Sequence, residues 1–331
     1  MTAREPRSPA VEARDLTKTY PRGVKALDGL TFEVAEGETF GLLGPNGAGK
    51  STTIKILTTL AKADSGVARV VGQDVTRDPQ EVRRRIGVVS QRSGADPVAS
   101  GVENLLLQGR LCRVPAGELR RRGSELLDRF GLADAASRKV RTYSGGMQRR
   151  LDIAMALVHR PRVLFLDEPT TGLDPEARTA MWQEIARLSR DVGMTVLLTT
   201  HYLEEADRLA DRIAIVDRGR IVAEGTADQL KTELEGDGID IELADATQAE
   251  LARGVVASLP GIREVAVEQR RVTARAQDGA GAVPAALAAL ERAGIGVAAV
   301  SVTRPSLDDV YLRHTGRRFA EAALAASGGD A

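Results

Sequence analysis

Short apolar runs alternate with segments of helical periodicity up to about Gly225. The runs at Thr39 to Leu43, Val163 to Glu168 and Thr195 to Thr200 are typical of strands buried on both faces of a parallel sheet. Further strands are predicted at Val11 to Leu16, Leu30 to Val34, Val67 to Val71, Ile86 to Ser90, Ile213 to Asp217 and Arg220 to Ala223. Helices are predicted at Ser51 to Ala61, Pro79 to Arg85, Arg149 to His159 and Glu176 to Arg190. The pattern predicts an α/β domain over residues 1–230.

Two regions depart from this alternation. Between residues 93 and 158 the period is helical, so we predict an all-helical insert. After a charged stretch at Lys231 to Gly238, residues 231–316 run strand, helix, strand, strand, helix, strand, and then a helix opened by a capping box at Ser306 to Asp309. This order predicts a smaller α+β domain of ferredoxin-like topology. Residues 317–331 are rich in Ala and predict a flexible tail.

Composition limits the kinds of partner. Lys plus Arg and Asp plus Glu both number 46, so no net charge attracts nucleic acid, and aromatic residues are only 3%, too few for a base-stacking surface. A single cysteine excludes an internal disulfide framework and suits a reducing compartment. No stretch approaches about 18 apolar residues in a row, and the first ten residues lack an apolar signal core. We therefore expect a chain that neither spans a membrane nor is secreted.

Residues 44–51 form a complete phosphate-binding loop between a predicted strand and a predicted helix. Glycines let successive backbone N–H groups point at phosphate oxygens, and the helix adds the positive end of its dipole. We expect Lys50 on the β- and γ-phosphates of a nucleotide and the Ser51 hydroxyl on Mg²⁺. An ordinary glycine-rich turn is the alternative. The predicted nucleotide-binding residues of this segment are Gly44, Pro45, Asn46, Gly47, Ala48, Gly49, Lys50, Ser51 and Thr52.

Polar side chains follow other predicted strands, at the sheet edge where open α/β folds collect ligands. Asp167 would bind Mg²⁺ and the adjacent Glu168 would polarise the attacking water. His201 would hydrogen-bond the γ-phosphate, and the Gln91 amide oxygen would be a third metal ligand beside Ser51 and Asp167. The alternatives are an acidic pair in a loop and a structural histidine.

Two more features extend the predicted site. Tyr20, in a turn, would stack on the nucleotide base, unless it is only a packed surface residue. Ser144, Gly145 and Gly146 open a helix and resemble a second anion cradle, although such a segment can also be a linker. One chain holding one ATP has little use for a second cradle. We therefore expect two chains to pack head to tail, each completing the other's site.

Together these motifs resemble the nucleotide-binding domain of an ATP-binding cassette (ABC) ATPase, a P-loop NTPase. The matching segments, in order, are Tyr20 (A-loop), residues 44–51 (Walker A), Gln91 (Q-loop), residues 144–146 (signature), residues 163–167 (Walker B), residues 171–174 (D-loop) and His201 (switch). The resemblance implies ATP and Mg²⁺ as cofactors and catalytic roles for Glu168 and His201. The signature departs from the family pattern, with Tyr143 and Met147 where Leu and Gln are usual.

Within that family, residues 143–147, 199–206 and 305–312 are similar to daunorubicin-resistance-type export ATPases. The resemblance implies an ATP-hydrolysing subunit at the cytoplasmic face of the cell membrane. Two copies would dock beneath separate ABC-2-type integral membrane permease subunits and energise efflux of a drug, antibiotic or other hydrophobic compound. A soluble non-transport cassette and an importer ATPase are the alternatives. One set of motifs and an appended domain that alternates strand and helix favour the exporter.

Overall fold

The structure, a computed structural model, describes residues 9–234, 236–319 and 321. The chain divides into two compact units, Met1–Ala227 with Phe319–Ala331, and Asp228–Arg318. Most of the predicted tail, residues 320 and 322–331, lies outside the described residues, as do the first eight residues.

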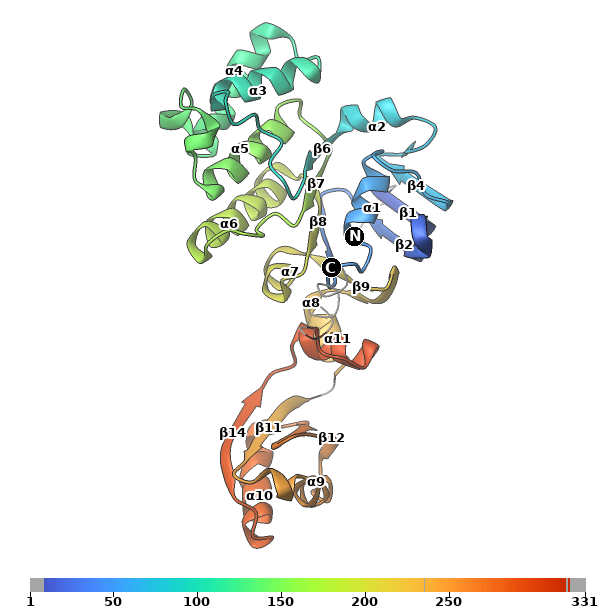
Figure 1. The fold of residues 1–331 in the computed structure, drawn as a ribbon, viewed down its shortest axis with the longest axis vertical. Coiled ribbons are helices and arrows are strands. Elements are labelled where there is room, and N and C mark those ends of the chain that lie inside the picture. Colours follow the sequence, from blue (N-terminus) through green and yellow to red (C-terminus); the bar gives the residue numbers. More distant parts are fainter. Residues whose placement is uncertain (1–8, 235, 320, 322–331) are drawn as a thin grey trace, which may run out of the picture. The chain divides into compact units, whose positions relative to one another are not determined.

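A six-stranded sheet of order β10-β9-β3-β8-β7-β6 forms the centre of the first unit (Figure 1). All neighbours are parallel except the pair of β10 and β9. The strands are β3 Thr39–Leu43, β6 Ile86–Val89, β7 Val163–Asp167, β8 Thr195–Thr200, β9 Arg212–Asp217 and β10 Arg220–Gly225. Every residue of β3 and β8 is buried, which confirms the prediction made from their apolar runs. The carboxyl ends of β3, β6, β7 and β8 consequently meet at one edge of the sheet.

A second, antiparallel sheet has the order β2-β1-β4-β5. It contains β1 Val11–Tyr20, β2 Val24–Val34, β4 Ser65–Val70 and β5 Gln73–Asp74. The strands predicted at Val11 to Leu16 and Leu30 to Val34 are too short. In the structure β1 and β2 pair as far as Tyr20 and Val24 through three register shifts, so the hairpin includes polar positions that the apolar pattern did not mark as strand.

Helix α1, Lys50–Leu57, starts directly at the phosphate-binding loop. It is shorter than the predicted Ser51 to Ala61. Thr59 adopts a left-handed conformation, with φ of 66°, and the N–H of Leu60 bonds back to the carbonyl of Lys55, which closes the helix.

The remaining helices of the first unit surround the parallel sheet. They are α2 Pro79–Arg85, α3 Gly101–Leu111, α4 Ala116–Arg129, α5 Gly145–Leu157, α6 Pro175–Val192 and α7 Leu203–Leu209. Figure 1 shows α3, α4 and α5 gathered in the predicted insert, which shares one apolar cluster with β7, β8 and α6. The insert is therefore packed onto the sheet that carries the predicted site.

The second unit contains β11 Asp237–Leu243, α9 Ala249–Ala257, β12 Ile262–Glu268, β13 Arg271–Ala276, α10 Gly279–Arg292, β14 Val297–Thr303 and α11 Leu307–Thr315, preceded by α8 Ala227–Thr232. Its sheet has the order β12-β13-β11-β14 with antiparallel neighbours, which confirms the predicted ferredoxin-like arrangement. The predicted capping box is also present. Ser306 caps α11 and Asp309 reaches back to the Ser306 N–H at 2.9 Å.

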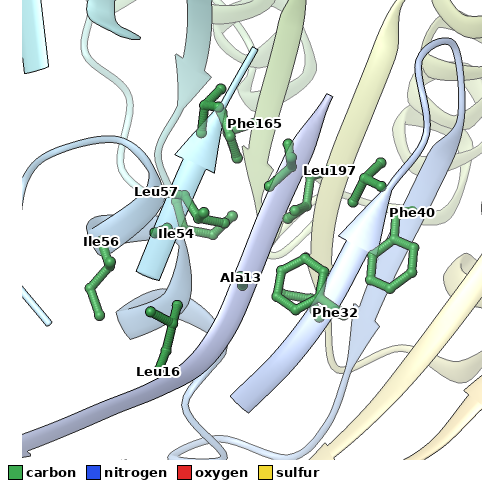
Figure 2. Packing of buried hydrophobic residues seen from close by; sticks show 14 of the residues in the cluster. Ala13, Leu16, Phe32, Phe40, Ile54, Ile56, Leu57, Phe165 and Leu197 are labelled. Atoms are coloured by element: carbon green, nitrogen blue, oxygen red, sulfur yellow. The ribbon is translucent and has the colours of Figure 1, made fainter. Parts of the chain in front are cut away.

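A second buried apolar cluster of the first unit is formed by both sheets and α1 (Figure 2). Phe32 and Phe40 stack with ring centroids 5.2 Å apart, and Ile54 and Leu57 of α1 belong to the same buried cluster. Since Phe40 is one residue into β3, this core supports the strand that leads into the phosphate-binding loop.

Replacing Phe40 by Ala should lower the free energy of unfolding of the first unit by about 3–5 kcal/mol, because the side chain is fully buried and its removal leaves a cavity. Chemical denaturation followed by fluorescence of the single tryptophan, Trp182, measures this change. Val192→Ala, at a position 52% exposed, is the control and should change stability by less than about 0.5 kcal/mol. A loss below about 1 kcal/mol for Phe40→Ala would show that the cluster closes over the gap.

Candidate active site

The phosphate-binding loop joins β3 to α1 in a conformation that requires glycine at two positions. A Cβ on Gly44 would lie 2.4 Å from the carbonyl oxygen of Val216. Gly49 has φ of 110°, and a Cβ there would lie 2.5 Å from the carbonyl oxygen of Ala26. Because both clashes are with backbone atoms, no side chain can move aside to relieve them. The loop is thereby held against β2 and β9 and left open at Asn46 and Gly47, which are exposed.

Lys50 is 4% exposed and folds back along this loop. Its Nζ donates to the carbonyls of Gly44 and Pro45, at 2.7 and 3.0 Å, and lies 3.6 Å from Oε1 of Glu168. Burial lowers the pKa of Lys50, while the carboxylates of Glu168 and Asp167 act in the opposite direction. The ammonium group is thus directed to the face of the loop where phosphate oxygens would lie.

Asp167 ends β7 and is joined to two other segments by hydroxyl groups. Its Oδ1 accepts from Oγ of Ser51 at 3.1 Å and from Oγ1 of Thr199 at 2.6 Å. Ser51 comes from α1 and Thr199 from β8, so the three oxygens converge from separate elements. Within the described residues, no cluster of three or more His, Cys, Asp or Glu side chains is arranged to hold a metal ion. A cation bound here would take oxygen ligands from the nucleotide as well.

Glu168 lies next in the chain and is 8% exposed. Its backbone φ of 48° turns the side chain toward the loop, and its N–H donates to Oγ1 of Thr199 at 3.1 Å. Oε2 accepts from Nε2 of Gln91 and from Oγ1 of Thr171, each at 3.2 Å, and lies 3.2 Å from Nδ1 of His201. The structure therefore brings Gln91 and His201 to the same carboxylate.

The environment of Glu168 determines its charge. Burial raises the pKa of its carboxyl group, but the His201 imidazole, the Lys50 ammonium and the Thr171 hydroxyl together outweigh burial. The pKa consequently lies below its usual range, and the group is a carboxylate at neutral pH. A buried carboxylate held in this way can accept a hydrogen bond from a water molecule placed over the loop.

Arg149, on α5, is a residue that the sequence motifs did not predict. It is 7% exposed and donates to the carbonyls of Pro169, Asp167 and Glu168, at 2.8, 3.1 and 3.2 Å, and to that of Ser90. Its guanidinium thus fixes the backbone around the two acidic residues and the end of β6. Thr199 was also missed, because a hydroxyl at a strand end carries no pattern of its own. Thr171 lies in the segment matched to the D-loop, but the contact of its hydroxyl with Glu168 was not predicted.

Tyr20 and the segment Ser144 to Gly146 make their contacts outside the cluster of Lys50, Asp167 and Glu168. Tyr20 ends β1, is partly buried, and has Nζ of Lys18 at 5.8 Å from its ring centroid. Ser144 is exposed and caps α5, accepting the N–H of Met147 at 3.2 Å. Among the described residues, neither Tyr20 nor Ser144 has a hydrogen bond to the phosphate-binding loop.

Comparisons with known proteins agree with this geometry. Residues 27–171 match the ABC transporter family, and residues 225–315 match the C-terminal domain of DrrA1-3-like ATP-binding proteins. Over 303 residues the chain is 50% identical to the daunorubicin resistance ATP-binding protein DrrA3 of Streptomyces coeruleorubidus, covering 90% of this chain and 94% of that protein. The chain belongs to the ABC transporter family of ATP-binding proteins. This ABC protein binds and hydrolyses ATP.

A more distant sequence relative and a solved structure are also similar to this chain. The ABC protein is 36% identical over 310 residues to the linearmycin resistance ATP-binding protein LnrL of Bacillus subtilis, covering 93% of this chain and 98% of that one. A solved dimeric ATP-binding cassette in a post-hydrolysis state, bound to ADP and Pi, is 30% identical with a TM-score of 0.59, covering 65% of this chain and 98% of that one. No helix in the described part of the ABC protein is long and apolar enough to cross a bilayer.

Replacing Thr199 by Val should lower kcat/KM for ATP hydrolysis by about 10–100-fold, since it removes the hydroxyl that orients Asp167 and receives the Glu168 N–H. Steady-state ATPase assays of the purified chain measure this. Thr199→Ser keeps the hydroxyl and should stay within about threefold of wild type. Equal activity in the Val and Ser variants would show that the hydroxyl does not contribute.

Proposed function

We propose that the chain is the ATP-hydrolysing subunit of an ABC exporter that energises efflux of a drug, an antibiotic or another hydrophobic compound. The observation that supports this proposal is similarity to resistance proteins over 90% or more of this chain, combined with the cluster of Lys50, Asp167, Glu168 and His201. The relatives are named for resistance to daunorubicin and linearmycin, and one from Ralstonia nicotianae, 38% identical, is named for Nod factor export. This agreement favours export over the importer and non-transport alternatives.

The chemistry follows from the positions of the side chains. Backbone N–H groups of the phosphate-binding loop and the Lys50 ammonium bind the phosphates of ATP, and Tyr20 lies against its base. Ser51 and Asp167, with Gln91, would hold Mg²⁺, and the ion would supply positive charge against the negative charge on the phosphates. Glu168 accepts a hydrogen bond from the attacking water and His201 holds the γ-phosphate. Arg149 holds the backbone of the two acidic residues, and Thr199 holds the Asp167 carboxylate.

Two copies of the chain form the working ATPase in this proposal. Ser144, Gly145 and Gly146 start a helix of 13 residues, α5, so their N–H groups lie at a positive dipole end. Ser144 and Gly145 are exposed and contact no residue of their own phosphate-binding loop by hydrogen bonding. The start of α5 binds the γ-phosphate of the ATP that is held in the phosphate-binding loop of a second copy. The dimeric form of the solved cassette bound to ADP and Pi supports this arrangement.

A groove between the helical insert and the parallel sheet is the site at which the permease docks. The groove has a volume of about 1050 Å³, and Leu60 and Leu111, each 70% exposed, lie along it. Ser90 and Gly94, on either side of Gln91, also line the groove. A cytoplasmic helix of an ABC-2-type permease that binds in this groove would therefore contact the segment that carries Gln91. Docking in this groove holds the chain at the cytoplasmic face of the membrane.

The C-terminal domain, residues 231–316, acts in assembly with the permease or the second copy. All the side chains that contact Lys50, Asp167 and Glu168 belong to the first unit. The chemistry thus belongs to residues 1–230, and the second domain is free to serve another role.

Replacing Glu168 by Gln should slow ATP hydrolysis by about 10²–10⁴-fold while leaving ATP binding intact, because the loop and Lys50 remain. We expect a dimer on size exclusion in the presence of ATP. In cells that also produce the permease, the same variant should lose drug resistance. The control is Glu204→Gln on the exposed side of α7, which should behave as wild type. A Glu168→Gln protein that hydrolyses ATP normally would contradict the assigned role.

Mixing two inactive variants tests the shared site. Ser144→Arg blocks the cap and Lys50→Ala blocks the phosphate-binding loop, so each variant alone should be inactive as a homodimer. A mixed dimer contains one intact site and one doubly damaged site. ATPase activity should therefore reappear on mixing. Full activity of Ser144→Arg alone at saturating concentration would mean that Ser144 caps no phosphate.

A further inference from the structure

Glu205 is a fully buried carboxylate, 0% exposed, in the first turn of α7. Its Oε1 accepts from Oγ1 of Thr170 at 2.7 Å and from Nε1 of Trp182 at 3.0 Å. Thr170 lies in the turn after Glu168, and Trp182 lies in α6. One oxygen atom therefore joins three segments that are distant in the sequence.

The second oxygen of the same carboxylate has a different environment. Oε2 of Glu205 is buried and has no hydrogen-bond partner among the described residues. Its negative charge acts on the guanidinium of Arg149, which also binds the backbone of Asp167 and Glu168. A buried carboxylate with an unpaired oxygen is costly for folding. An apolar residue would avoid that cost but would leave the buried Thr170 hydroxyl and Trp182 N–H without an acceptor, so the carboxylate at this position is tied to these two donors.

The hydrogen bond between Thr170 and Glu205 forms a bridge between two segments. One segment carries Glu168 and the other carries His201. Thr170 precedes Thr171, whose hydroxyl donates to Oε2 of Glu168 at 3.2 Å. The N–H of Thr171 also donates to the carbonyl of Glu168 at 3.3 Å, which closes the turn. At the other end, Glu205 lies four residues after His201, on the helix that directly follows it. The bridge therefore fixes the distance between the segment that carries Glu168 and the segment that carries His201.

We propose that Glu205 is a positioning residue for ATP hydrolysis, which holds the turn after Glu168 against α7 so that Glu168 and His201 stay aligned. It contacts neither substrate nor the reacting atoms. The hydrogen bond between Glu205 and Thr170 is the contact that holds the turn after Glu168 in place. The bond to Trp182 anchors the carboxylate to α6 and gives the bridge a fluorescent reporter, since Trp182 is the single tryptophan of the chain.

The proposal makes a specific kinetic prediction for the full-length chain. Thr170→Val, which is close to isosteric, removes the hydroxyl from the bridge and leaves the bond between Trp182 and Glu205 in place. We expect kcat to fall by about 10–100-fold while KM for ATP stays within about threefold, because no phosphate contact is lost. The emission spectrum of Trp182 should remain that of wild type, which shows that α6 and α7 are still packed.

Variants of Glu205 itself complete the experiment. Glu205→Ala should lower kcat as Thr170→Val does and also change the Trp182 spectrum, whereas Glu205→Gln keeps an acceptor oxygen and should restore most of kcat. Glu204→Ala, at an exposed neighbour, is the control and should match wild type. Wild-type kcat in Thr170→Val would overturn the proposal, as would a loss caused entirely by a higher KM. Since the assay measures ATP hydrolysis alone, its outcome is independent of what the protein exports.

Discussion

An ammonium group and a carboxylate, those of Lys50 and Glu168, face each other across 3.6 Å in a nearly buried site. Neither charge could be buried alone without a large cost in solvation. Two loop carbonyls complete the surroundings of Lys50, and His201, Gln91 and Thr171 complete those of Glu168. The pair thus joins the phosphate-binding loop and the end of β7 into one site.

The backbone around this pair is held from behind by Arg149. Glu168 adopts a left-handed conformation that is unfavourable for a residue with a side chain. Arg149 offsets that cost by donating to the carbonyls on both sides of the turn. The same residue lies on α5, whose first turn begins at Ser144. One buried guanidinium thus connects α5, the helix that Ser144 caps, to the backbone of the acidic residues.

The unusual signature residues are accommodated by the helical insert. Tyr143 is 6% exposed and donates its hydroxyl to the carbonyl of Ala135 at 2.7 Å, while Met147 packs against the insert's apolar cluster. Both side chains thus serve packing within the insert. The start of α5 is determined by the Ser144 cap, which depends on Ser144 Oγ and the Met147 backbone and on neither of the two unusual side chains.

By itself the sequence determined the helices, strands and site residues that depend only on residues a few positions away in the chain. The buried strands β3 and β8, helix α2 and the phosphate-binding loop could be predicted because apolar runs, a proline at a helix start and glycine spacing act within a few residues. The strand ends also predicted Asp167, Glu168 and His201. Tertiary structure alone decided the length of the hairpin of β1 and β2, since its ladder depends on pairing between strands rather than on apolar spacing. It likewise decided the roles of Arg149, Thr199 and Glu205, because their partners are carbonyls, carboxylates and hydroxyls that only the folded chain brings within hydrogen-bonding distance.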